Sequence, residues 1–252
     1  MTSLHALIQT LDDWMKPELF KDYAPNGLQV EGRDTISRLA LGVTASADVI
    51  QQAVAWGADA LLVHHGYFWR NEPPVLTGMK GQRVRALMNH QMSLIAYHLP
   101  LDCHSEFGNN KTLLDQLGLI GGQPIVEENG LLWSVPLASA MTMDQLALQV
   151  QSALGRAPMV IESPRGSETL SRLVVCTGGA QDYLAKALYY GADVYLSGEI
   201  SERTTHEARE LGVHYIAAGH HATERYGVQA LGQKLASTLP VDVAFFDDHN
   251  PA

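Results

Sequence analysis

The stretch LALGVTASADVIQQAVAWGADALLVHHG, residues 39–66, decides the fold class. Residues 39–44 and 60–63 are short apolar runs that predict buried strands. Between them Ser46 is a typical helix N-cap and Gly57 a typical C-terminal glycine, so we expect a helix that ends near Trp56. A strand, a helix and a strand with short links form a βαβ unit, whose strands pair in parallel.

The same pattern occurs a second time in the chain. Residues 172–199 align with residues 38–65 without a gap, and Gly57-Ala-Asp59 matches Gly191-Ala-Asp193. We therefore interpret the chain as an α/β protein with two duplicated halves and partly parallel sheets. The expected segments are a first half, 1–126, a small connecting α/β section, 127–165, and a second half, 166–252. Duplicated halves that face each other would share one ligand cleft at their strand ends.

Composition excludes several classes of function. With a formal net charge of -10 and a pI near 5.5, the 252-residue chain lacks the basic surface expected of a general nucleic-acid-binding protein. No apolar run has the length of a membrane span. The two cysteines, Cys103 and Cys176, do not form a disulfide framework, so we expect a soluble cytoplasmic protein.

Histidines are concentrated directly after expected strands. Of the eleven histidines, six lie in three short stretches, which are His64-His65, His98 with His104, and His220-His221. Acidic side chains accompany two of these stretches, namely Asp102 and Glu224. A helix that begins at Gly219 or His220 would place His220 and Glu224 at i and i+4, on one face.

These residue types predict a metal site. Neutral imidazoles and carboxylates bind divalent zinc, manganese, iron, cobalt or nickel, and the residues do not distinguish among these ions. The five candidate ligands are His64, His65, Asp102, His220 and Glu224. Three histidines and two carboxylates exceed what one tetrahedral catalytic zinc takes from protein, and a carboxylate can bridge two ions. We therefore expect two divalent metal ions in the cleft.

Four segments resemble a known family, and the resemblance runs in order along nearly the whole chain. The segments are Tyr23-Ala-Pro-Asn-Gly-Leu-Gln-Val-Glu-Gly32, Val63-His-His-Gly-Tyr-Phe-Trp69, Tyr97-His-Leu-Pro-Leu-Asp102 and Gly219-His-His-Ala-Thr-Glu-Arg225. They are similar to the GTP cyclohydrolase I type 2 homologue family, also called NGG-one-interacting-factor-three-like, in its bacterial short form. The resemblance implies two intertwined α/β halves, a dinuclear metal site with the five ligands named above, and a toroidal homohexamer built as a trimer of dimers.

Other side chains near the motifs have weaker claims to a role. His98 and His104 are candidates for proton transfer or for support of the metal ligands, although structural hydrogen bonding explains them equally well. Cys103 beside His104 is better explained by packing than as a nucleophile. Glu199 either lines the cleft or stabilises a helix N-terminus. Residues 67–69 are three aromatics that could stack a heterocyclic ring, but packing at an interface is the favoured explanation.

Three functions remain compatible with these residues. The first is a metal-dependent hydrolase that acts on a small nucleotide-like or heterocyclic substrate, with GTP cyclohydrolase activity implied only by the family label. The second is an assembly that binds or delivers metal without turnover. The third is a scaffold that binds a partner protein.

Overall fold

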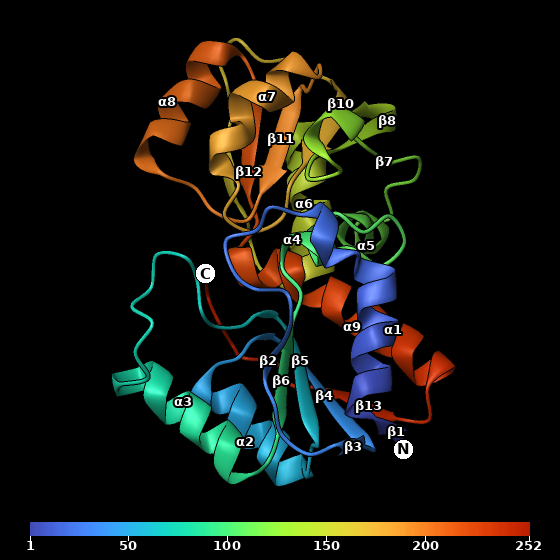
Figure 1. The fold of residues 1–252 in the computed structure, drawn as a ribbon. Helices are drawn as coiled ribbons and strands as arrows, with labels where there is room; N and C mark the ends of the chain where they lie inside the picture. The colour runs from blue at the N-terminus through green and yellow to red at the C-terminus, as the bar shows by residue number, and fades with distance from the viewer. The chain divides into compact units, whose positions relative to one another are not determined.

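The computed structural model describes the backbone of residues 1–252 and all side chains except those of residues 138–140. The chain forms two compact units, each built from separated segments. The first unit contains Met1–Leu101 and Val228–His249, and the second contains Asp102–Gly227 and Asn250–Ala252. Two α/β halves that exchange chain segments are therefore confirmed, while the division at residues 126 and 165 stays a prediction (Figure 1).

Two helices carry the chain from one unit to the other. α4 (Leu99–Asp102) ends at the first residue of the second unit, and α9 (His220–Thr238) begins in the second unit and ends in the first. The expected ligands Asp102 and His220 therefore lie at the ends of these two connecting helices.

A five-stranded sheet forms the centre of the first unit, in the order β13-β4-β5-β6-β2. β13, β4, β5 and β6 are parallel, and β2 is antiparallel to β6. The elements of this unit, in chain order, are β1 (Thr2–Ser3), α1 (Leu4–Met15), a 3-10 turn (Pro17–Leu19), β2 (Gly27–Val30), β3 (Thr35–Ile36), β4 (Arg38–Thr44), α2 (Ala47–Trp56), β5 (Ala60–His65), α3 (Gly78–Asn89), β6 (Ser93–Ala96) and β13 (Asp242–Phe245). β1 and β3 form a separate antiparallel pair.

The expected βαβ unit is present in the first unit as β4, α2 and β5. The Ser46 hydroxyl accepts a hydrogen bond from the backbone N–H of Val49, and Gly57 ends α2 at φ +77°. β5 continues two residues further than its apolar run, because its pairing with β4 extends to His65 opposite Thr44. Both histidines of the pair are thus strand residues, which the sequence pattern did not predict.

Side chains of the first sheet alternate between two apolar layers. One face packs against α2 and α3 through a buried cluster that includes Ala40, Leu61 and Val63. Leu41 points to the opposite face, where a Cβ on Gly232 of α9 would lie 2.2 Å from its Cδ1. A helix on each face keeps the parallel strands buried, as such sheets require.

The second unit has a six-stranded sheet in the order β7-β8-β10-β11-β12-β9. Its three central strands are parallel, and the strands beyond them pair antiparallel. The elements are α5 (Asn109–Gln116), β7 (Gln123–Pro124), a 3-10 turn (Val126–Glu128), β8 (Trp133–Met141), α6 (Met143–Leu154), β9 (Met159–Ile161), β10 (Leu170–Val175), a 3-10 turn (Gln181–Tyr183), α7 (Leu184–Tyr189), β11 (Val194–Ser197), α8 (Glu202–Leu211) and β12 (His214–Ala217). The connecting section, 127–165, thus contributes β8 and β9 to this sheet.

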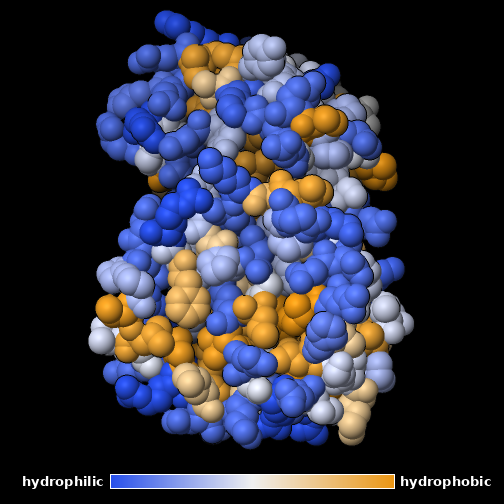
Figure 2. Space-filling view, viewed as in Figure 1, coloured by the Kyte–Doolittle hydropathy of each residue, from blue (hydrophilic) through white to orange (hydrophobic). Residues whose placement is uncertain are grey.

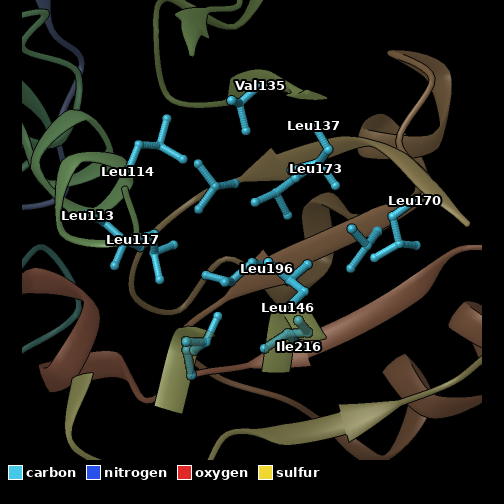
Figure 3. Packing of buried hydrophobic residues seen from close by; sticks show 14 of the residues in the cluster. Leu113, Leu114, Leu117, Val135, Leu137, Leu146, Leu170, Leu173, Leu196 and Ile216 are labelled. Atoms are coloured by element: carbon cyan, nitrogen blue, oxygen red, sulfur yellow. The ribbon is translucent and has the colours of Figure 1, made fainter. Parts of the chain in front are cut away.

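The two faces of the second sheet carry separate cores. Leu173, Leu196 and Ile216 face α5 and α6, where they pack with leucines of both helices (Figure 3). Tyr195 and Tyr215, from neighbouring positions on the same strands, face the core under α7 and α8. This alternation explains why the strands of this unit are apolar along their whole length.

Matching hydrogen bonds support the internal duplication. Asp59 accepts from the backbone N–H groups of Ser37 and Arg38 at 2.7 and 2.9 Å. Asp193 accepts from the residues at the matching positions of the second copy, at 2.7 and 3.0 Å. In both units the aspartate of the repeated Gly-Ala-Asp motif therefore connects the start of one strand to the start of the next by hydrogen bonds.

The face of the molecule drawn in Figure 2 is predominantly polar. Hydrophilic residues cover most of the face drawn in Figure 2, and hydrophobic residues gather over part of the first unit. Among the described residues, no helix has the length and apolar character that crossing a bilayer requires.

Candidate metal centre

The two units each contribute one cluster of the expected side chains. His64, His65 and His98 belong to the first unit, and Asp102, His104, His220 and Glu224 belong to the second. We describe the clusters separately, beginning with the histidines.

Three imidazoles converge at the carboxyl ends of β5 and β6. His64 is fully buried and His65 is half-buried, and their ring centroids are 4.4 Å apart. The His98 ring lies 5.1 and 5.7 Å from these two rings. Each ring offers a nitrogen within 4.8 Å of those of the other two, so this cluster can hold a metal ion.

Each of these imidazoles is held at its Nδ1 atom. His64 Nδ1 is 3.0 Å from the carbonyl oxygen of Tyr97, and His65 Nδ1 is 3.2 Å from the Thr44 hydroxyl. His98 Nδ1 donates to the Asp22 carboxylate at 2.7 Å. A carbonyl or a carboxylate only accepts, so in a neutral ring of His64 or His98 the Nε2 atom keeps its lone pair. Metal-binding histidines have this arrangement.

Asp22 is a residue that the sequence analysis did not identify. Its carboxylate also accepts from the backbone N–H groups of Tyr23 and Leu99, at 2.6 and 2.9 Å, and from the Asn26 amide at 2.9 Å. Burial alone raises the pKa of Asp22, but its hydrogen bonds and the charge of His98 together have the larger, opposite effect. The pKa is therefore lowered to about 2. Asp22 is therefore ionised at neutral pH and fixes the orientation of the His98 ring.

The three aromatic residues after the histidine pair have different surroundings. Tyr67 is buried and donates to the Ala45 carbonyl oxygen at 2.6 Å, so it belongs to the core. The Trp69 ring lies 5.9 Å from His65 and 5.0 Å from His98. Of residues 67–69, Trp69 is thus the one whose ring borders the histidine cluster.

In the second unit, α9 begins at His220, as expected, and places Glu224 one turn later. His220 Nε2 is 3.2 Å from Glu224 Oε2. Glu224 and Asp102 are 3% and 6% exposed, and each offers a carboxylate oxygen within 4.8 Å of the other. Two buried carboxylates at this separation repel each other, so a bound cation would stabilise the pair.

Neighbouring residues leave room for these candidate ligands and orient them. Asp102 Oδ1 accepts from the Asn109 amide at 2.8 Å and lies 3.5 Å from the Thr177 hydroxyl. Next to Thr177, Gly178 has φ +70°, and a Cβ there would lie 2.1 Å from Glu224 Oε1 and 3.1 Å from His220 Nε2. Only glycine leaves this space open, and the donor set around it fits a divalent cation.

Glu199 orients His220 in the same way that Asp22 orients His98. Its carboxylate accepts from His220 Nδ1 at 2.7 Å. Burial lowers the pKa of His220, but the hydrogen bonds and charges of Glu224 and Glu199 raise it to about 9. A cation bound to Nε2 would replace the proton that this nitrogen shares with Glu224. The sequence favours Glu199 as a cleft residue or a helix-terminal carboxylate, and the structure adds its contact with His220, a candidate ligand.

Other histidines are used differently. The His104 ring stacks on Phe107 at 3.5 Å, and its Nδ1 accepts from the backbone N–H groups of Glu106 and Phe107. Burial lowers the pKa of His104. His214 uses both nitrogens, because Nδ1 accepts from Ser163 and Nε2 is 3.0 Å from a carbonyl oxygen. These contacts suit structural roles, and proton transfer by His104 stays a prediction.

Comparison with known proteins gives consistent matches along the whole chain. A family model described as Duf34/NIF3 (NGG1p interacting factor 3) matches residues 2–251. A protein of Allochromatium vinosum named GTP cyclohydrolase 1 type 2 homolog is 52% identical over 252 residues, which cover 100% of this chain and 98% of the relative. A protein of the same name from Vibrio cholerae is 46% identical and covers 96% of each chain.

Solved structures agree with these matches. A structural-genomics protein called ybgI, described as of unknown function, superposes with a TM-score of 0.95 at 42% identity, over 100% of both chains. The protein TTHA1606 from Thermus thermophilus has a TM-score of 0.92 at 30% identity, also over 100% of both chains.

Proposed function

The chain belongs to the Duf34/NIF3 (NGG1p interacting factor 3) family, and we propose that it binds two divalent metal ions and hydrolyses a small nucleotide-like or heterocyclic substrate. The proposed ligands are His64 and His65 in the first unit and Asp102, His220 and Glu224 in the second. The family resemblance of the four motifs and the chemistry of the two clusters support this ligand set.

The observation that carries the proposal is the shared hydrogen-bonding pattern of the ligand histidines. Each of His64, His65 and His220 has a protein partner at Nδ1. A protein that used these rings only for packing would have no reason to repeat this pattern at three positions. Ligand histidines need it, because the Nδ1 partner fixes the tautomer and the orientation of the ring.

Five ligands suit two ions better than one. A catalytic zinc takes three protein ligands and leaves one position open. Glu224 lies within reach of both Asp102 and His220, and in this proposal its carboxylate would help to hold both ions. Carboxylates commonly bridge the ions of two-metal hydrolytic sites.

Proton transfer falls to His98 in this proposal. When bound, a pair of divalent ions lowers the pKa of water and polarises a phosphoryl or carbonyl oxygen. His98 has Nε2 available, and Asp22 accepts from its Nδ1 and fixes the orientation of the ring. His98 can therefore take a proton at Nε2 and release it to the leaving group.

The experiment is a hydrolysis screen against nucleotides and cyclised purine or pterin compounds, combined with metal analysis of the same protein. Glu224→Gln should remove metal and turnover together, whereas His98→Gln should keep the metal and lose turnover. Glu202→Gln, which changes an exposed glutamate of α8, is the matched control. Metal binding without turnover in the wild-type chain would exclude the hydrolase and favour metal delivery, and absence of bound metal would refute the proposal.

Self-association and location complete the proposal. A homohexamer, built as a trimer of dimers, would cover apolar side chains that the first unit exposes, including Val75, Leu76, Met79 and Met88. Light scattering of the purified chain tests this assembly. A cytoplasmic location fits the two cysteines, which form no disulfide in the structure.

A further inference from the structure

A pocket of about 550 Å³ lies in the second unit at the carboxyl ends of β11 and β12. Gly198 and Glu199 follow β11, and Ala217 is the last residue of β12. The loop between α6 and β9 forms another wall with Arg156 and Pro158. Open α/β sheets bind ligands at the carboxyl ends of their parallel strands, and this volume suits a small molecule.

Arg156 is the cation of this pocket, and its guanidinium is available to a ligand. Arg156 is half-buried, yet no group in the described part of the chain forms a hydrogen bond or an ion pair with it. By contrast, Arg225 nearby donates to the Leu154 carbonyl oxygen, and Arg165 donates to that of Glu210. A guanidinium has five donors in a planar fork that matches carboxylate and phosphate oxygens.

Gly219 allows the guanidinium to lie beside α9. The backbone of Gly219 has φ +102°, and a Cβ at this position would lie 2.2 Å from Nη1 of Arg156. The positive charge therefore rests against the turn that leads into His220. The first turn of α9 adds a partial positive charge on the same side, although one of its N–H groups, that of His221, already donates to Ala252.

The remaining walls define what else the ligand carries. Glu199 supplies an acidic side chain whose carboxylate is occupied by His220 Nδ1, and Ala252 also lines the pocket. Pro158, Met159 and Ile200 supply apolar surface, and Met159 is 57% exposed. The pocket thus offers one cation and an apolar wall, next to a residue that orients a proposed metal ligand.

We propose that Arg156 binds the phosphate or carboxylate group of a small-molecule ligand whose flat apolar part lies against Met159 and Ile200. Binding of the oxyanion does not depend on the metal. Identification of this molecule as the substrate rests on the proposed metal-dependent function, because the pocket reaches that centre through Glu199. A substrate held at Arg156 would be an anionic heterocycle, which is a narrower class than the nucleotide-like or heterocyclic substrates of the proposed function.

The test measures binding to the full chain by titration calorimetry with two matched pairs of probes. AMP and nicotinate carry a phosphate and a carboxylate on a flat ring, and adenosine and nicotinamide are their neutral counterparts. Each probe is titrated into the wild type, Arg156→Gln and the control Arg165→Gln. Metal content and thermal unfolding are recorded for every variant, so that folding and metal binding are scored separately.

We expect at least one oxyanion to bind the wild type more tightly than its neutral counterpart, and the better of the two identifies the ligand group. Arg156→Gln should weaken that binding by about ten-fold or more and leave the metal content unchanged, because a charge-assisted hydrogen bond is lost. Arg165→Gln should bind as the wild type does. Equal binding by wild type and Arg156→Gln, or no preference for either oxyanion, overturns the inference. If the wild-type chain binds no metal but still binds the oxyanion through Arg156, the proposed function is refuted and this inference stands.

Discussion

Replacing Gly178 by alanine tests the second-unit cluster without removing any ligand. The new Cβ would lie 2.1 Å from Glu224 Oε1, so the carboxylate has to move by roughly 1 Å, a displacement that is large for a ligand. We expect the affinity for Zn²⁺ or Mn²⁺ to fall about 10- to 100-fold, as it does when the groups that position metal ligands are disturbed. This loss corresponds to about 1.4–2.8 kcal/mol.

Gly155 provides the matched control. It has the same φ of +70°, but a Cβ there would meet no atom within 4 Å. Alanine in the left-handed region costs about 1–2 kcal/mol at either site, which lowers the melting temperature of a chain this long by roughly 2–8 °C. The backbone cost is thus common to both variants, and the loss of metal affinity should be confined to Gly178→Ala.

Competition with a chromogenic chelator gives the affinity, and thermal unfolding confirms that both variants are folded. If folded Gly178→Ala bound the metal as tightly as Gly155→Ala, Glu224 and His220 would not surround the ion. The space that Gly178 leaves beside Glu224 would then be a packing feature, and the proposed ligand set would lose its support in the second unit.

Three further outcomes follow from the same structure. The pKa of His220 is raised to about 9, so protonated His220 stabilises the metal-free protein by roughly 3 kcal/mol below pH 6.5, and this stabilisation is lost as pH rises through 9. Urea unfolding at pH 6 and 9.5 measures the loss, and equal free energies of unfolding at the two pH values would contradict the prediction. Asp59→Asn and Asp193→Asn should each lower the free energy of unfolding by about 1–3 kcal/mol, because two backbone N–H groups lose a charged acceptor, and an effect at only one site would show that the duplicated contacts are not equivalent. A bound metal at a free concentration 100 times its Kd should raise the free energy of unfolding by about 2.7 kcal/mol, detectable as a higher melting temperature that a chelator reverses.

The fold was predictable where local chemistry sets the structure. The cap at Ser46, the glycine that ends α2 and the gap-free repeat were all visible in the sequence, and the repeated hydrogen bonds of Asp59 and Asp193 show why the repeat persists. The length of β5 was not predictable from hydrophobicity, because pairing with β4 and not apolar character carries the strand on to His65. The segment 127–165 was expected to be a small α/β section, but the sheet partners of its strands β8 and β9 depend on long-range packing.

The candidate metal centre was likewise predictable only in part, because some of its features depend on residues that are close in the sequence and others on residues that are far apart. The positions of the candidate ligands were predictable, since each follows a strand or shares a helix face, and such patterns span only a few residues. The partners of the rings were not, because Asp22 is 76 residues from His98, and Glu199 is 21 from His220. These partners decide which nitrogen carries the proton, and therefore whether a histidine can bind a metal at Nε2. His214 illustrates the consequence. Both of its ring nitrogens are engaged, so it cannot act as a ligand without breaking a hydrogen bond. A histidine in a sequence is thus a candidate ligand, and its distant neighbours determine whether it can serve as one.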